Sequence, residues 1–130
     1  MVEPQLDAEE RQAFERGVGQ FNDGYFFECH DTLEEVWGGV RGPARDFLQG
    51  LIQVSVGFYH LTGDNPVGAA SMFERALKRL AKYPDRYWGF DLAAHRSEVQ
   101  AWHAHACAGT PLDGSATLPK WRFEWMAHSS

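Results

Sequence analysis

The sequence predicts an all-α protein, a compact bundle of about five helices, and three observations support this fold class. Apolar residues recur at helical spacing over several stretches, whereas no alternating pattern of useful strand length occurs. Residues that favour helix starts, such as Asp7, Pro43 and Asn65, stand directly before these stretches. Short breaks that contain glycine separate the stretches, as is typical of antiparallel helix pairs.

The first two predicted helices form one antiparallel hairpin. The first opens at a capping box, in which Asp7 and Glu10 satisfy each other's backbone groups, and it ends at residues 22–24. The second helix follows at once and covers about residues 25–37. Residues 1–6, which precede this hairpin, are expected to be a loose lead-in.

The next two predicted helices form a second hairpin of the same kind. Residues 43–62 make the third helix, and Asn65 caps a fourth helix that ends at residues 82–85. Two helix–turn–helix units in tandem suggest the pairing of tetratricopeptide proteins. Two units are fewer than a solenoid needs, so we expect a compact bundle.

The last part of the chain is predicted to hold one more helix and a tail. Residues 87–90 predict an aromatic loop, after which Asp91 caps a fifth helix that reaches about Ala108. Residues 109–130 are predicted to be a wrapping or docking tail, because residues 119–123 are too aromatic for a purely solvated segment. The tail is expected to dock on the bundle or on a second subunit. Residues 1–130 together are predicted to form a single helical domain.

Composition argues against several classes of function. The formal net charge of −6 and the pI of 5.4 argue against nucleic acid as a partner, because that role needs a basic face. The apolar runs are far too short for a membrane span. Cys29 and Cys107 fit no metal spacing and are too few for a disulfide framework, so we expect free thiols and a cytoplasmic location.

A narrow polar stripe on the third helix is the feature on which the functional prediction depends. The helix is apolar on nearly every other side, and such helices are normally buried, so the stripe needs partners. The second helix offers His30 and Glu34, four residues apart within an aromatic face. We therefore predict that both helices contribute to an inward polar cluster. Its residues are His30, Glu34, Trp37, Arg45, Gln49, Gln53 and His60.

The same stretch resembles a known family. Residues 28–37 read E-x-H-D-x-L-E-x-x-W, and residues 45–53 read R-x-x-L-Q-G-L-I-Q. This combination is similar to the motif of the bacterial and archaeal family called "domain of unknown function 309", over about residues 13–105. Asp31 stands where the family pattern usually has Glu. The resemblance implies an all-helical bundle and no established activity.

Three interpretations of the inward polar cluster stay open. In the first, it is a satisfied buried network in which Arg45 pairs with Glu34. In the second, His30, Glu34 and His60 bind Zn, Mn or Fe(II), which would suit a metal-dependent or acid–base enzyme. In the third, the cluster is the polar part of a small-molecule pocket. The aromatic walls of that pocket would be Phe26, Trp37 and Tyr59.

The sequence as a whole predicts a helical binding or interaction module of unknown molecular function. No catalytic residue is assigned, because no nucleophile with its own base, no phosphate loop and no dinucleotide motif is visible. The partners left open are a second copy of the chain, as a homodimer, and an unidentified small molecule. Nucleic acid and membrane are not expected. Surface positions are predicted for His95, His103 and His105.

Overall fold

The computed structural model describes residues 3, 5–110, 112 and 117–122 and confirms the all-α fold class. Among these residues, no helix combines the length and the apolar composition needed to cross a membrane. The five helices are α1 (Ala8–Asn22), α2 (Phe26–Gly39), α3 (Pro43–Thr62), α4 (Pro66–Leu80) and α5 (Leu92–Cys107).

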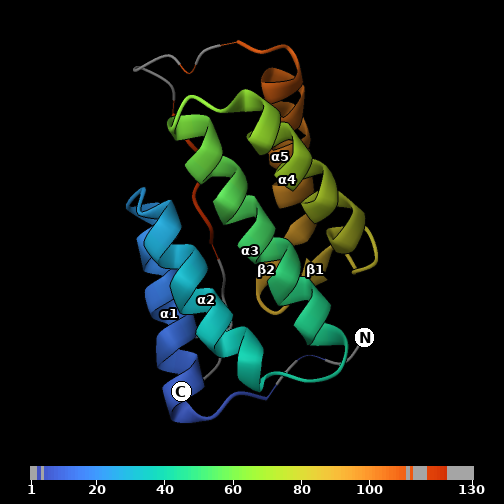
Figure 1. Cartoon of the computed structure of the whole chain (residues 1–130). Helices are drawn as coiled ribbons and strands as arrows, with labels where there is room; N and C mark the ends of the chain where they lie inside the picture. Colours follow the sequence, from blue (N-terminus) through green and yellow to red (C-terminus); the bar gives the residue numbers. More distant parts are fainter. Residues whose placement is uncertain (1–2, 4, 111, 113–116, 123–130) are drawn as a thin grey trace.

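Each helix packs against the next one along the chain, so the two predicted hairpins are present. In Figure 1, α1 and α2 form one pair, α3 and α4 form the second, and α5 lies behind α4. The contact between α2 and α3 joins the two hairpins. A row of sequential neighbours of this kind keeps most helix contacts local in the sequence.

The helix starts follow the capping residues of the sequence. Asp7 and Glu10 form the predicted capping box, with the Glu10 backbone N–H donating to Asp7 Oδ1 at 2.8 Å. Asn65 Oδ1 accepts from Gly68 N at 3.0 Å and opens α4. Asp91 Oδ1 accepts from the third residue of α5 at 3.2 Å. These side chains satisfy backbone donors that the first helical turn leaves without partners.

A short antiparallel hairpin lies where the sequence predicted a loop. Strand β1 (Arg86–Tyr87) pairs with β2 (Phe90–Asp91). Trp88 and Gly89 form the turn, and both have positive φ, at 51° and 77°, as the two central residues of a type I′ hairpin turn require. Strands of two residues are too short for any alternating pattern, which is why the sequence did not reveal them.

The core is rich in aromatic rings that come from distant parts of the chain. The ring of Phe14 on α1 stacks on Trp88 of the hairpin, with centroids 4.4 Å apart. Phe47 on α3 meets Tyr87 at 4.9 Å, and Phe58 on the same helix meets Phe73 of α4 at 4.9 Å. The aromatic hairpin is therefore part of the core.

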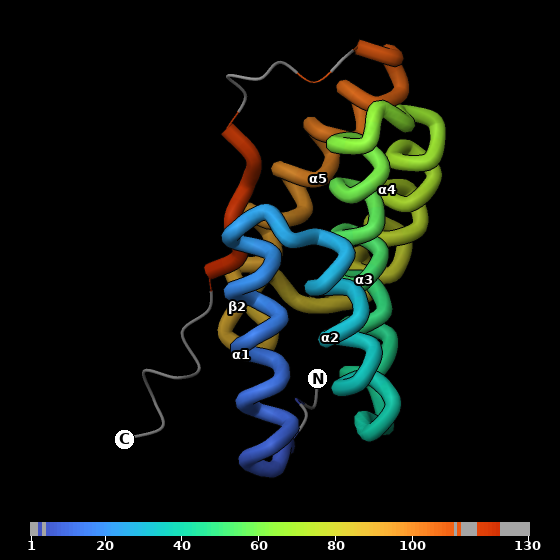
Figure 2. The backbone as a smooth tube through the Cα atoms, turned by 60° about the vertical axis from the view of Figure 1, so that its left-hand side comes forward, coloured from blue at the N-terminus to red at the C-terminus, as the bar shows by residue number. Residues whose placement is uncertain are grey.

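The segment of residues 117–122 docks on the bundle within the same chain. Trp121 is 2% exposed, and its ring stacks on Phe21 of α1 with centroids 3.9 Å apart and planes 5° apart. Asn22 binds the Trp121 backbone twice: its Nδ2 donates to the carbonyl at 3.0 Å, and its Oδ1 accepts from the N–H at 2.7 Å. Figure 2 shows this segment beside α1 and α5. Residues 111, 113–116 and 123–130 of the predicted tail lie outside the described residues.

Gly57 allows α3 and α4 to approach closely. A Cβ atom at this position would overlap the ring of Phe73, which is fully buried in α4. Gly19 on α1 is different, because a Cβ atom there would have nothing within 4 Å. The two helical glycines therefore offer a matched pair of substitutions.

We expect Gly57→Ala to lower the free energy of unfolding by on the order of 1–3 kcal/mol, because the added methyl group overpacks the core. Gly19→Ala is expected to raise it by about 0.5–1 kcal/mol, since alanine favours the helix and meets no obstacle. Urea unfolding of both variants measures this. Equal effects of the two substitutions would contradict the close approach of α3 and α4.

Candidate functional site

The inward polar cluster predicted between α2 and α3 does not form. The side chain of Glu34 is 54% exposed, and its Oε1 lies 3.1 Å from His30 Nε2 on the same helix. Among the described residues, no hydrogen bond or ion pair joins Glu34 to Arg45. The prediction of a buried carboxylate was wrong because its partner is one turn away on the helix surface. Fully buried apolar residues such as Leu33 and Leu48 occupy the inner faces instead.

Two residues of the predicted cluster do meet across α2 and α3, but through stacking. The Arg45 guanidinium carbon lies 3.7 Å from the centroid of the Trp37 ring. A guanidinium over an indole face is a favourable cation–π arrangement. Arg45 is therefore engaged near the start of α3 and not with the carboxylate of Glu34.

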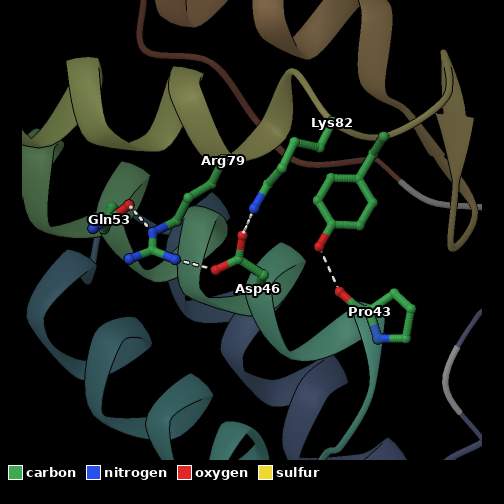
Figure 3. A network of polar contacts seen from close by, with 6 residues as sticks. Pro43, Asp46, Gln53, Arg79 and Lys82 are labelled. Atoms are coloured by element: carbon green, nitrogen blue, oxygen red, sulfur yellow. Dashed lines mark hydrogen bonds and ion pairs between the residues drawn. The ribbon is translucent and has the colours of Figure 1, made fainter.

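Gln53 belongs to a different polar network, which faces α4 (Figure 3). Gln53 is buried, and its Oε1 accepts a hydrogen bond from Arg79 Nε at 3.1 Å. Arg79 also donates to Asp46, one more residue of α3, and Lys82 pairs with the second oxygen of the same carboxylate. Burial alone would raise the pKa of Asp46, but Lys82 and Arg79 together hold it below its usual value.

The same region has a second polar link. The Tyr83 hydroxyl donates to the backbone carbonyl of Pro43 at the start of α3 (Figure 3). Burial raises the pKa of Tyr83, and the neighbouring Asp46 charge acts in the same direction, so the hydroxyl keeps its proton. These contacts fix the start of α3 to the end of α4, which is a structural role.

The metal set His30, Glu34 and His60 is not assembled. His60 lies in the last turn of α3, where its Nδ1 is 3.4 Å from Asn65 Nδ2. Among the described residues, the group that could hold a metal ion is His30, Asp31 and Glu34, with one ligand atom from each within 4.8 Å of the others. Gln49, the remaining predicted residue, is partly buried on α3.

The His30 ring lies between two exposed carboxylates. Its Nδ1 is 3.3 Å from Asp31 Oδ1, and its Nε2 is 3.1 Å from Glu34 Oε1. The carboxylates are 58% and 54% exposed, so both face solvent while they flank the imidazole. One imidazole and two carboxylates form a mixed nitrogen and oxygen donor set, which attracts cations.

Three more aromatic rings continue from this imidazole across the end of the bundle. Phe27 lies 5.7 Å from His30 and 5.4 Å from Tyr59, and Tyr59 lies 5.9 Å from His60, all between ring centroids. We call Phe27, His30, Tyr59 and His60 the aromatic patch. It joins the start of α2 to the end of α3, at the upper end of the bundle in Figure 1. His30 and His60, which the sequence singled out, are therefore connected through rings.

The aromatic patch is open to solvent. Phe27 is 48% exposed and Tyr59 is 47% exposed. A hollow of about 380 Å³ adjoins it and is lined by Tyr59, His60 and the turn that follows α3. The sequence placed His30 within an aromatic face of the second helix but did not show that part of this face is exposed to solvent. Its neighbour Phe26 is the buried one of the pair, at 4% exposed.

Residues 14–72 match the family model described as "Domain of unknown function (DUF309)". The resemblance predicted from the sequence is confirmed. The DUF309 match runs from α1 into α4 and includes the aromatic patch, whereas α5 and residues 117–122 lie outside it. The predicted extent, about residues 13–105, was longer than the match.

One relative is an uncharacterized protein of Aquifex aeolicus (strain VF5). It is 30% identical over 81 residues, which are 62% of this chain and 24% of the relative. This chain therefore spans about a quarter of the length of that relative. The molecular function of the protein is unknown, since neither the DUF309 description nor that of the relative names an activity.

Two residues outside the aromatic patch, Cys29 and His95, are buried. Burial raises the pKa of the Cys29 thiol to about 12, so this cysteine is a packing residue and not a nucleophile. His95 was predicted to lie on the surface, and this is wrong because it is 6% exposed beneath Trp121. His95 and Trp121 lie far apart in the sequence, so their contact could not be predicted from spacing.

We expect Asp46→Asn to lower the free energy of unfolding by about 0.5–1 kcal/mol at neutral pH, because two cations lose a partly exposed partner. The folded pKa of Asp46 is lowered, so its stabilisation is complete above the unfolded pKa of about 4. The stabilisation is lost as the pH falls through the folded value. Urea unfolding across this range measures the difference between the two proteins.

The matched control for this prediction is Glu74→Gln, which removes a 58% exposed carboxylate that pairs with Lys78 at 3.4 Å. We expect little change from it at any pH, because exposed pairs of this kind contribute little. A difference between Asp46→Asn and wild type that does not shrink in acid would contradict the assigned network.

Proposed function

We propose that this domain is a protein-interaction module, cytoplasmic in location, that binds a cationic and apolar segment of a partner protein on its aromatic patch. The observation that carries the proposal is the solvent-open row of four rings beside two exposed carboxylates. Catalysis is not part of the proposal, because the patch has no activated nucleophile. The free thiols of Cys29 and Cys107 support the cytoplasmic location.

Exposed apolar area supports the binding role. Large apolar side chains are usually buried, and groups of them that stay exposed mark interaction sites. Phe27 and Tyr59 leave about half of their surface in solvent, and Tyr25 and Val67 at the same end of the bundle are 59% and 80% exposed. A partner that covers these residues would gain from burying them.

Charge supports a cationic partner. Glu28, Asp31 and Glu34 are all exposed on α2, and the chain has a formal net charge of −6. Aromatic faces attract guanidinium and ammonium groups, and the chain's own Arg45 already makes such a contact with Trp37. A Lys or Arg of the partner would therefore find both ring faces and carboxylates at the aromatic patch.

The comparisons support a modular role. The Aquifex relative is about four times as long as the segment that aligns with this chain, so in that protein the aligned region is one part of a longer chain. Small helical units within longer chains commonly serve as binding surfaces, where exposed residues and not the fold decide the partner. The aromatic patch lies inside the DUF309 match.

We expect a fluorescein-labelled amphipathic peptide of Arg and Leu to bind, as measured by fluorescence anisotropy. Tyr59→Ala should weaken binding about tenfold, because aromatic residues often dominate such interfaces. Glu34→Gln should weaken it less and should reduce its dependence on salt. Gln12→Ala, an exposed change on α1, is the control and should leave the affinity unchanged.

Two outcomes would refute this proposal. The first is equal binding of a peptide in which every Arg is replaced by Glu, since the carboxylates would then have no role. The second is a homodimer that buries Tyr59 in sedimentation experiments and dissociates on Tyr59→Ala. In that case a second copy of the chain, and not a cationic segment, would occupy the aromatic patch.

A further inference from the structure

The docked segment of residues 117–122 packs on a buried aromatic cluster to which three helices contribute. Trp121 stacks on Phe21 of α1, with centroids 3.9 Å apart. Phe21 in turn meets Phe26 of α2 at 5.2 Å and Phe58 of α3 at 5.8 Å. The last two rings stack on each other at 5.5 Å. All four rings are at most 4% exposed, so Trp121 closes the outer side of a buried cluster.

Two rings of this buried cluster immediately precede the exposed rings of the aromatic patch. Phe26 is followed by Phe27, and Phe58 is followed by Tyr59. Successive residues of a helix share one rigid backbone, so a displacement of the buried ring also moves its exposed neighbour. The contact of 5.4 Å between Phe27 and Tyr59 therefore depends on how the buried cluster holds α2 and α3.

The start of α2 depends on this packing because it lacks a capping side chain. Tyr25 stands at the N-cap position and makes no side-chain hydrogen bond to the first turn, unlike Asn65 at the start of α4. A helix end without a cap leaves backbone donors free, and tertiary contacts then supply most of its stability. For α2 these contacts are those of Phe26 with Phe21 and Phe58.

The backbone of the docked segment is also bound close to the start of α2. Asn22 is the last residue of α1, and it makes two hydrogen bonds with the Trp121 backbone. Three residues, 23–25, separate it from Phe26, the first residue of α2. The docked segment thus holds the end of α1 both through its ring and through its backbone.

We propose that Trp121 is a positioning residue for the aromatic patch, an inference that rests on the proposed function of that patch. Docking of residues 117–122 holds Phe27 and Tyr59 in the geometry that binds a partner, and release of the segment lets the start of α2 fray. Among the described residues, no hydrogen bond or ring contact joins the segment to these two rings, so its effect passes through Phe21. A patch that is ordered in advance binds more tightly, because less conformational entropy is lost on binding.

The first test needs no peptide. The Cys29 N–H donates to the Tyr25 carbonyl at 2.9 Å, in the first turn of α2. We expect Trp121→Ala to speed hydrogen exchange of this amide about tenfold, because the turn opens more often. The control is the Ala69 N–H, which donates to the Asn65 carbonyl at 3.0 Å in the capped first turn of α4. Its exchange should stay as in wild type.

Asn22→Ala is a second, milder variant. It removes both hydrogen bonds to the Trp121 backbone and leaves every ring in place. Alanine favours helices, so the variant keeps the end of α1. It should speed exchange of the Cys29 N–H by a smaller factor than Trp121→Ala does. Gln12→Ala, an exposed change on the same helix, should leave this exchange unchanged.

The second test uses the peptide of Arg and Leu. Trp121→Ala should weaken its binding about fivefold. Coupling between two sites is reciprocal, so saturating peptide should slow exchange of the Trp121 N–H, which donates to Asn22 Oδ1, by about the same factor. The Leu92 N–H, which donates to the Asp85 carbonyl at 2.7 Å, is the control and should not respond. A segment that only stabilises the fold would show no response to the peptide either.

Two results would overturn the proposal. One is unchanged exchange of the Cys29 N–H in Trp121→Ala, because the segment would then not hold the start of α2. The other is a peptide that binds wild type and Trp121→Ala equally well. Failure of the proposed function gives a different pattern: the peptide would bind neither protein, while exchange at Cys29 would still respond to Trp121→Ala.

Discussion

The structure depends on burying α3. Twelve of its twenty residues are buried, more than the contacts of a two-helix hairpin can cover. Helices α2 and α4 pack on two sides. Aromatic rings from other parts of the chain also contact α3. Phe21 of α1 and Trp102 of α5 both contact Phe58. Tyr87 of the hairpin contacts Phe47. Because the hydrophobic effect favours covering all this apolar surface, every other element finds its place relative to α3.

The helices could be predicted because their signals are local. A cap such as Asp7 or Asn65 acts on a backbone group three residues away, and the apolar spacing of α3 needs no knowledge of its neighbours. Both kinds of signal are visible in a single stretch of sequence. Residues 87–90 were predicted as an aromatic loop, and the structure shows that they form part of a short two-stranded hairpin and that their aromatic rings are buried.

The partners of polar side chains could not be predicted in the same way. Periodicity places Gln53 on a polar stripe of α3 but does not say whether α2 or α4 faces that stripe. Arg79 of α4 is the partner, 26 residues along the chain. Glu34 pairs with a residue that is closer in the sequence, since His30 lies one turn away on the same helix. A pair at the surface avoids the cost of burying a charge.

The sequence also did not predict contacts between residues that lie far apart in the chain. His95 is buried by Trp121, whose backbone is bound by Asn22, 99 residues earlier in the chain. No spacing rule links such positions, and their pairing follows from the completed bundle.

The double hydrogen bond between Asn22 and Trp121 also bears on how the protein matures during synthesis. Helices α1 to α4 can form while the rest of the chain is still being translated, since their contacts are mostly local. The Phe21 ring, by contrast, stays without its stacking partner until residue 121 has left the ribosome. Until then, the nascent chain exposes the face of the Phe21 ring that Trp121 covers, and exposed apolar surface of this kind is what chaperones bind.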